Sequence, residues 1–202
     1  MAQHYFETDP TGPHRRRTIT VTLRGREREM ATEGGVFSAG RLDLGTQVLL
    51  RSVGDPPPSG TLMDLGCGWG PIALAMATAS PAARVLATDI NPRALALTAA
   101  NAAQAGLDNV QTWTPHELLA AEEDLGIDEL WSNPPIRVGK PALHELLATW
   151  LPRLRPSGQA HLVVQRNLGA DSLHRWIETD LGLPTTRTAS AKGFRVLTIR
   201  SG

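Results

Sequence analysis

The chain has 202 residues, and 41% of them are hydrophobic, which is enough for one domain with a buried core and excludes a disordered protein. Equal numbers of basic and acidic residues give no net charge, so the chain is not a polycation that coats nucleic acid. The single cysteine, Cys67, excludes a disulfide framework and a cysteine-rich zinc site, and we expect no metal. Neither an apolar run of transmembrane length nor an apolar signal core is present, so we expect a cytoplasmic protein without membrane contact.

The neutral total conceals an uneven distribution of charge. Residues 89–130 are mostly acidic where they are charged, whereas residues 131–202 and the stretch 13–28 are rich in arginine. Blocks of opposite sign can give a neutral protein one basic face. Two interpretations stay open: a face that binds nucleic acid, or arginines that are solvated on helices and at strand ends.

The first 34 residues are predicted to form an N-terminal arm. Ile19, Val21 and Leu23 alternate with polar residues in the manner of a strand, and Gly25 can turn the chain back into a second strand. Residues 35–53 run from a glycine-rich loop into a short helix, which the three prolines of the linker 55–60 end. We therefore divide the chain into a hairpin arm, 1–34, and a catalytic domain, 35–202.

After the linker, predicted strands alternate with predicted helices. The strands are 61–66, 83–89, 109–113, 127–135 (which ends in two prolines), 159–165 and 192–200, and the helices are 71–80, 92–106, 141–154 and 170–182. This order predicts an α/β fold with a mostly parallel sheet covered by helices on both faces. Such sheets bind ligands at the carboxyl ends of their strands.

A glycine-rich loop, Asp64-Leu65-Gly66-Cys67-Gly68-Trp69-Gly70, follows the first of these strands and opens a helix. Its glycines permit a tight turn and close approach of the backbone to a ligand, and a helix N-terminus favours a negative group. A dinucleotide loop would need its third glycine one residue later, where Pro71 stands. The spacing instead suits a ligand with an amino-acid end, whose ammonium Asp64 can attract.

Asp89 ends the second strand of the series, where a carboxylate can accept hydrogen bonds from both hydroxyls of a ribose. An amino-acid end and a ribose together predict S-adenosylmethionine as the cofactor. The alternative is that the glycine loop serves only to pack the helix.

A second motif, Ser132-Asn133-Pro134-Pro135-Ile136, follows the fourth strand. An exocyclic amine or amide nitrogen is a poor nucleophile because its lone pair is delocalised. The side-chain oxygen of Asn133 and a backbone carbonyl near Pro134 can each accept one of its N–H groups, and the prolines fix the backbone that aims them. The alternative is a Pro-Pro turn that merely ends the strand.

The two motifs, in this order, resemble class I methyltransferases that modify nitrogen, and more closely the small-domain methyltransferase family, which includes ribosomal RNA guanine-N2 methyltransferases. The resemblance rests on residues 35–46, 64–73, 87–94, 132–140, 192–197 and His144. It implies a Rossmann-like, seven-stranded, mostly parallel sheet with an antiparallel last strand. It also implies S-adenosylmethionine as cofactor and S-adenosylhomocysteine as product.

The resemblance and the loop chemistry together assign the site residues. The catalytic residues are Asn133, Pro134 and Pro135; the cofactor-binding residues are Asp64, Gly66, Cys67, Gly68, Gly70, Asp89, Ile90 and Asn133; the substrate-binding residues are Phe37, Thr46, Ile136, Arg137 and Lys140. Ile136 departs from the aromatic residue that many nitrogen methyltransferases carry there, which leaves adenine less supported as the target.

The leading hypothesis is methylation of the exocyclic amine of a guanine in ribosomal or other RNA. The alternative with the same chemistry is methylation of a glutamine side-chain amide in a translation factor. Two other classes are a nicotinamide-dependent dehydrogenase, which the glycine spacing disfavours, and a non-catalytic cofactor-binding module, which Asn133 disfavours. For His144 a structural role is favoured over contact with the substrate, Trp69 in the glycine loop is a candidate to border the cofactor, and the sequence assigns no oligomeric state.

Overall fold

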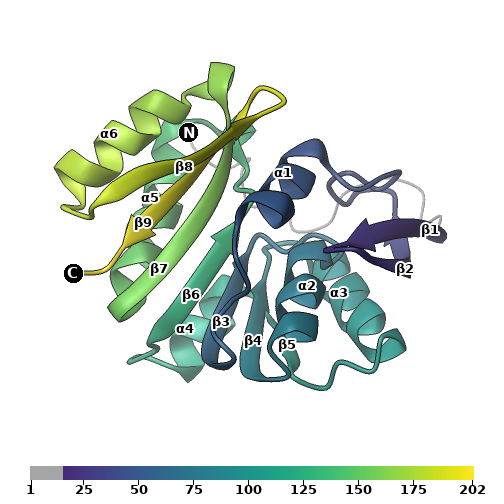
Figure 1. The fold of residues 1–202 in the computed structure, drawn as a ribbon. Coiled ribbons are helices and arrows are strands. Elements are labelled where there is room, and N and C mark those ends of the chain that lie inside the picture. The colour runs from purple at the N-terminus through teal and green to yellow at the C-terminus, as the bar shows by residue number, and fades with distance from the viewer. Residues whose placement is uncertain (1–15) are drawn as a thin grey trace, which may run out of the picture.

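Seven strands form one sheet in the order β5-β4-β3-β6-β7-β9-β8 (Figure 1). The structure is a computed structural model that describes residues 16–202. The strands are β3 (Ser59–Leu65), β4 (Ala82–Thr88), β5 (Val110–Trp113), β6 (Ile127–Ser132), β7 (Leu154–Gln165), β8 (Thr185–Ala191) and β9 (Phe194–Arg200). β9 pairs antiparallel with both β7 and β8, while the other pairings are parallel. The predicted mostly parallel sheet with an antiparallel last strand is confirmed.

Helices cover both faces of this sheet, as the alternation of elements predicts. They are α1 (Leu44–Ser52), α2 (Pro71–Ala79), α3 (Pro92–Gln104), α4 (Pro115–Ala121), α5 (Lys140–Trp150) and α6 (Ala170–Asp180). Successive strand residues point to opposite faces, so Leu62 packs in an apolar cluster with α1, α2 and α3, and Met63 packs in a second cluster with α4, α5 and α6. None of the helices between residues 16 and 202 has the length and apolarity to cross a bilayer.

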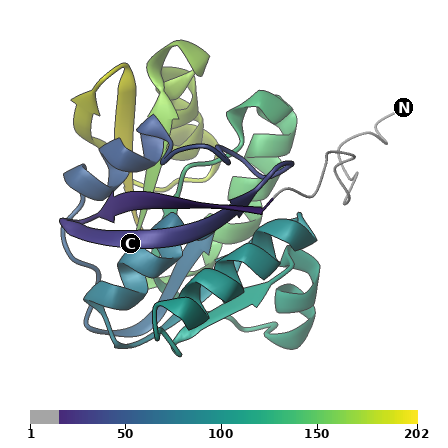
Figure 2. The same ribbon diagram turned by 90° about the vertical axis from the view of Figure 1, so that its right-hand side faces the viewer.

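The predicted hairpin is present as β1 (Arg16–Leu23) and β2 (Arg26–Glu33), which pair antiparallel. It lies across α1, α2 and α3 (Figure 2). Val21, Leu23 and Met30 are buried in the same cluster as these helices, so the hairpin shares the core of the domain. Residues 1–15 of the predicted arm lie outside the described residues, and the boundary at residue 34 stays a prediction.

Two elements were not expected from the sequence. α4 begins at a capping box in which Thr114 and Glu117 exchange hydrogen bonds. β8 is a mostly exposed edge strand without the apolar alternation by which strands are recognised. In addition, the helix predicted over 141–154 ends at Trp150, followed by a single 3-10 turn, and β7 begins earlier than expected, at Leu154.

Candidate active site

The three predicted segments of the site meet at one edge of the sheet. The glycine loop 66–70 follows β3, Asp89 follows β4 and Asn133 follows β6, and both β4 and β6 are neighbours of β3. The hydroxyl of Ser132, at the end of β6, donates a hydrogen bond of 2.6 Å to the carbonyl of Leu65, at the end of β3. The order of the strands reverses between β3 and β6, which is where parallel α/β sheets bind their ligands.

The three glycines of the loop have different surroundings. All three adopt positive φ angles, of 80° at Gly66, 57° at Gly68 and 92° at Gly70. A Cβ atom added at Gly66 or Gly68 would meet no atom within 4 Å, whereas one at Gly70 would lie 2.9 Å from Oγ1 of Thr98. The first two glycines therefore leave open space beside the loop, and the third lets α3 pack closely against it.

Backbone hydrogen bonds tie the glycine loop to the end of β4. The amides of Gly66 and Cys67 both donate to the carbonyl of Thr88 at 2.9 Å, and the amide of Gly68 donates to Oδ2 of Asp89 at 3.0 Å. Burial raises the pKa of the Cys67 thiol well above its usual value. The thiol therefore stays protonated, and Cys67 offers the site its backbone and its small size rather than a nucleophile.

Asp64 is fully buried at the end of β3, beneath the start of α2. Its Oδ2 accepts a hydrogen bond of 2.8 Å from the amide of Ala73, and its Oδ1 is buried without a partner among the described residues. Burial raises the pKa of Asp64 to about 8; the hydrogen bond from Ala73 opposes the rise, and the negative charge of Asp89 adds to it. A buried polar atom without a hydrogen-bond partner is costly. A cationic group of a ligand could supply the partner that this carboxyl oxygen lacks.

Asp89 is half-buried and holds two backbone amides. Its Oδ1 accepts from Asn91 at 2.9 Å, and its Oδ2 accepts from Gly68. Burial raises its pKa, against the hydrogen bonds from these amides. A carboxylate has about four acceptor sites, so capacity remains for the hydroxyls of a ligand. The next residue, Ile90, is 39% exposed and offers an apolar surface beside the carboxylate.

The side-chain amide of Asn133 is held by the N-terminus of α1. Its Nδ2 donates to Oδ2 of Asp43 at 2.8 Å and to Oγ1 of Thr46 at 3.1 Å. No hydrogen bond to its Oδ1 is found among the groups that the structure describes. The amide therefore offers an acceptor, and not a donor, to anything that approaches.

The prolines after Asn133 make a sharp turn into a 3-10 turn, Ile136–Val138. The carbonyl of Pro134 accepts a hydrogen bond of 2.8 Å from the amide of Ile136. A carbonyl oxygen has two lone pairs, so this oxygen retains one. Pro134 is buried and Pro135 is exposed, and Ile136 is half-buried against the second apolar cluster.

The other predicted substrate residues are distributed unevenly around this edge. Phe37, in the loop before α1, is 65% exposed. Thr46 is buried and contacts Asn133 rather than open space. Lys140 is exposed at the start of α5, and the side chain of Arg137 lies outside the described part of the structure.

Two functional candidates were missed by sequence reasoning, Asp43 and Asn101. The available signal for Asp43 was its position as a helix N-cap, since its side chain also accepts from the amide of Thr46 at 3.1 Å.

Asn101 is buried in α3, where its Nδ2 donates to the carbonyls of Trp69 at 2.8 Å and Ala31 at 2.9 Å, and its Oδ1 accepts from the amide of Ala31 at 2.7 Å. Its one sequence signal was a polar residue within an alanine-rich helix. Asn101 thus joins the hairpin to the glycine loop.

Trp69 and His144, whose roles the sequence left open, both have structural contacts. The side chain of Trp69 is buried in the first apolar cluster. The ring of His144 stacks on Trp176, with 3.8 Å between centroids, and joins α5 to α6. Within residues 16–202, no group of three or more His, Cys, Asp or Glu side chains could hold a metal ion.

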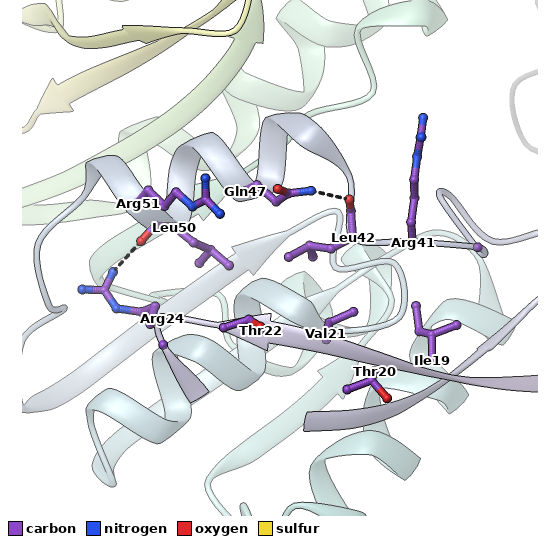
Figure 3. A pocket seen from close by; sticks show the side chains of 12 residues that line it. Ile19, Thr20, Val21, Thr22, Arg24, Arg41, Leu42, Gln47, Leu50 and Arg51 are labelled. Atoms are coloured by element: carbon purple, nitrogen blue, oxygen red, sulfur yellow. Dashed lines mark hydrogen bonds between the residues drawn. The ribbon is translucent and has the colours of Figure 1, made fainter. Parts of the chain in front are cut away.

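A groove of about 570 Å³ runs between β1 and α1 (Figure 3). Its lining includes the apolar side chains of Val21 and Leu50 and the guanidinium groups of Arg24, Arg41 and Arg51. Arg24 is engaged, because it donates to the carbonyl of Leu50 and pairs with a carboxylate in the linker. Arg41 and Arg51 are exposed and form no side-chain hydrogen bond or ion pair with the described residues. The groove therefore offers two positive charges that no residue in the described part of the chain pairs.

Comparison with known proteins gives consistent results. A family model described as "Methyltransferase small domain" matches residues 27–198. The chain is 31% identical to the uncharacterised protein YbxB of Bacillus subtilis over 85% of this chain and 86% of YbxB. It is 37% identical to ribosomal RNA small subunit methyltransferase C of Hahella chejuensis, over 76% of this chain but only 44% of that protein.

Among solved structures, the fold matches that of the Thermus thermophilus 16S rRNA N2 G1207 methyltransferase in complex with AdoMet and guanosine. The TM-score is 0.81 at 23% identity, and the match covers 96% of this chain and 52% of that one. At this identity the likeness establishes the fold. The chain spans about half the length of the ribosomal RNA methyltransferases that it matches.

Proposed function

The chain belongs to the methyltransferase small domain family, so residues 27–198 form an S-adenosylmethionine-dependent methyltransferase domain, and we propose that its methyl acceptor is the exocyclic amine of a guanine in RNA. Ribosomal RNA is the first candidate, because relatives named for it match most of this chain. The observation that carries the proposal is the amide of Asn133, which is held by its nitrogen and leaves its oxygen unpaired by the described residues.

The residues around the glycine loop suit the cofactor. S-adenosylmethionine, when bound, supplies a methyl group on a positively charged sulfur. The buried, unpaired Oδ1 of Asp64 would hold the ammonium of the amino-acid end, and the open space at Gly66 and Gly68 would admit that end close to the backbone. Asp89 would hold the ribose hydroxyls, and Ile90 would contact the adenine.

Asn133 and Pro134 supply the acceptors that an exocyclic amine needs. The oxygen of Asn133 would take one N–H of the target, and the remaining lone pair of the Pro134 carbonyl would take the other. With both N–H groups held, the nitrogen lone pair is directed toward the methyl group, and orientation of this kind can supply a large part of a rate enhancement. Both acceptors are neutral, so the target is bound without prior removal of its proton.

Two surface features favour RNA as the target. Arg41 and Arg51 on the groove beside α1 could contact phosphates, which provide much of the affinity of proteins for nucleic acid. Leu42 lines this groove, and the next residue along the chain, Asp43, contacts Asn133. Phe37 is an exposed aromatic ring on which a base could stack.

The test is transfer of a labelled methyl group from S-adenosylmethionine to RNA from cells that lack the gene. Mass spectrometry of the digested RNA should find N2-methylguanosine, and RNA from cells with the gene should accept little label. Label in another nucleoside would contradict the choice of guanine. Label in the protein fraction alone would favour the glutamine amide instead.

The matched control is Asn133→Ala. We expect its turnover to fall by a factor of about 100 or more, by analogy with a loss of roughly 3 kcal/mol when one oxyanion-hole donor is removed. Its affinity for S-adenosylmethionine, measured by calorimetry, should remain near that of the wild type. An unchanged single-turnover rate would exclude Asn133 from the reaction.

A further inference from the structure

We propose that Asp43 is a positioning residue, which fixes the side-chain amide of Asn133 with its oxygen toward the methyl acceptor. The inference rests on the proposed function, in which that oxygen accepts an N–H of the target. It starts from two hydrogen bonds, from Nδ2 of Asn133 to Oδ2 of Asp43 at 2.8 Å across 90 positions of sequence, and to Oγ1 of Thr46 at 3.1 Å across 87.

The chemistry of the two partners decides the orientation of the amide. A carboxylate only accepts hydrogen bonds, so Asp43 must face the NH₂ group of Asn133 and not its oxygen. The NH₂ group has two hydrogens, and Thr46 takes the second. No hydrogen of the amide is then left for a ligand. If the amide were turned over, it would direct N–H groups at the N–H groups of the target, and no hydrogen bond could form between them.

The backbone beside this contact leaves no space for a side chain. A Cβ atom added at Gly45 would lie 2.9 Å from Oδ2 of Asp43, 3.3 Å from Nδ2 of Asn133 and 3.0 Å from Cε1 of Phe194. The glycine between Asp43 and Thr46 therefore allows the two acceptors to close around the amide.

Asp43 also caps α1, and an experiment must separate this role from its contact with Asn133. Its Oδ2 also accepts the amide of Thr46 at 3.1 Å and so caps α1. Serine is as good an N-cap as aspartate, but its hydroxyl is one carbon closer to the backbone and cannot reach Asn133. Asparagine keeps an oxygen at the same distance along the side chain, so one oxygen can serve both the cap and Asn133.

The experiment therefore compares Asp43→Ser with Asp43→Asn in the full chain. With total RNA from cells that lack the gene and labelled S-adenosylmethionine, Asp43→Ser should lower kcat by about 10-fold or more, which is the size of effect expected when a hydrogen bond to a charged group is lost. The KM for S-adenosylmethionine and the Tm should stay near the wild-type values. Asp43→Asn should restore most of the lost kcat. A wild-type kcat in Asp43→Ser, or an equal loss in both variants, would overturn the inference.

A second readout does not depend on catalysis. In the ¹⁵N–¹H spectrum of the free protein, the NH₂ signals of Asn133, identified by their absence in Asn133→Ala, should exchange slowly with solvent. Asp43→Ser should accelerate this exchange, and Asp43→Asn should not. Fast exchange in the wild type, or equal exchange in Asp43→Ser, would show that Asp43 does not hold the amide. If exchange behaves as expected but the wild type methylates no RNA, the positioning contact stands and the proposed function fails.

Discussion

Asn101→Leu tests how the fold holds the glycine loop. The side chain of Asn101 is 2% exposed and makes three hydrogen bonds, to the amide and the carbonyl of Ala31 in the hairpin and to the carbonyl of Trp69 in the loop. Leucine has a similar volume and no polar atom, so the substitution leaves three backbone groups without their partner. Each buried group of this kind costs about 1–3 kcal/mol, with the partly buried groups of Ala31 at the low end. Burial of the leucine side chain offsets about 1–2 kcal/mol.

We therefore expect Asn101→Leu to lower the free energy of unfolding by about 3 kcal/mol, and to weaken the binding of S-adenosylmethionine because the loop loses an anchor. Urea denaturation followed by tryptophan fluorescence measures the first effect, and calorimetry measures the second. The matched control is Asn91→Ala, which removes an N-cap of α3 and a largely exposed hydrogen bond to Gly35, and should cost only about 1 kcal/mol. A loss in Asn101→Leu no larger than in this control would refute the reasoning.

Three further predictions concern the site. Asp89→Ala should weaken the binding of S-adenosylmethionine by about 10-fold or more, because a charged acceptor for the ribose and the hydrogen bond that anchors Gly68 are both lost. The affinity for RNA should stay unchanged. A cofactor affinity equal to that of the wild type, measured by calorimetry, would contradict this role. For Asp64, the pKa of about 8 in the folded protein lies above the 3.8 of an ordinary aspartate side chain, so its contribution to stability is complete below pH 3.8 and is lost as the pH rises to about 8. In the free protein, Asp64→Asn should therefore reduce the decline in stability between pH 5 and 8, measured by urea denaturation; an identical decline in both proteins would exclude the buried carboxyl as its source. Arg41→Glu together with Arg51→Glu should weaken RNA binding and reduce its dependence on salt, without effect on cofactor affinity; filter binding over a salt series would detect the change, and an unaltered salt slope would remove the groove from the RNA interface.

The linear sequence predicted most of the strands and helices in their order, although not α4 or β8, and it marked the three segments proposed to form the site. Apolar strands that end in the glycine loop, in Asp89 and in Asn133 are local patterns, and the rule that parallel strands end at one edge brings those segments together. The hairpin was likewise visible in the alternation of Ile19, Val21 and Leu23. β8 escaped prediction because it is a polar edge strand, whose pairing depends on β9 and not on burial of its own side chains.

Only the tertiary structure decided which atoms are free to act. Nothing in the local sequence distinguishes Gly70, whose missing side chain makes room for Thr98, from Gly66 and Gly68, which face open space. Asp43 reads as an ordinary N-cap until the fold brings it to Asn133, 90 residues away. Sequence patterns record burial and backbone preference, which are properties of neighbouring residues, whereas a hydrogen bond between distant side chains exists only after the chain has packed.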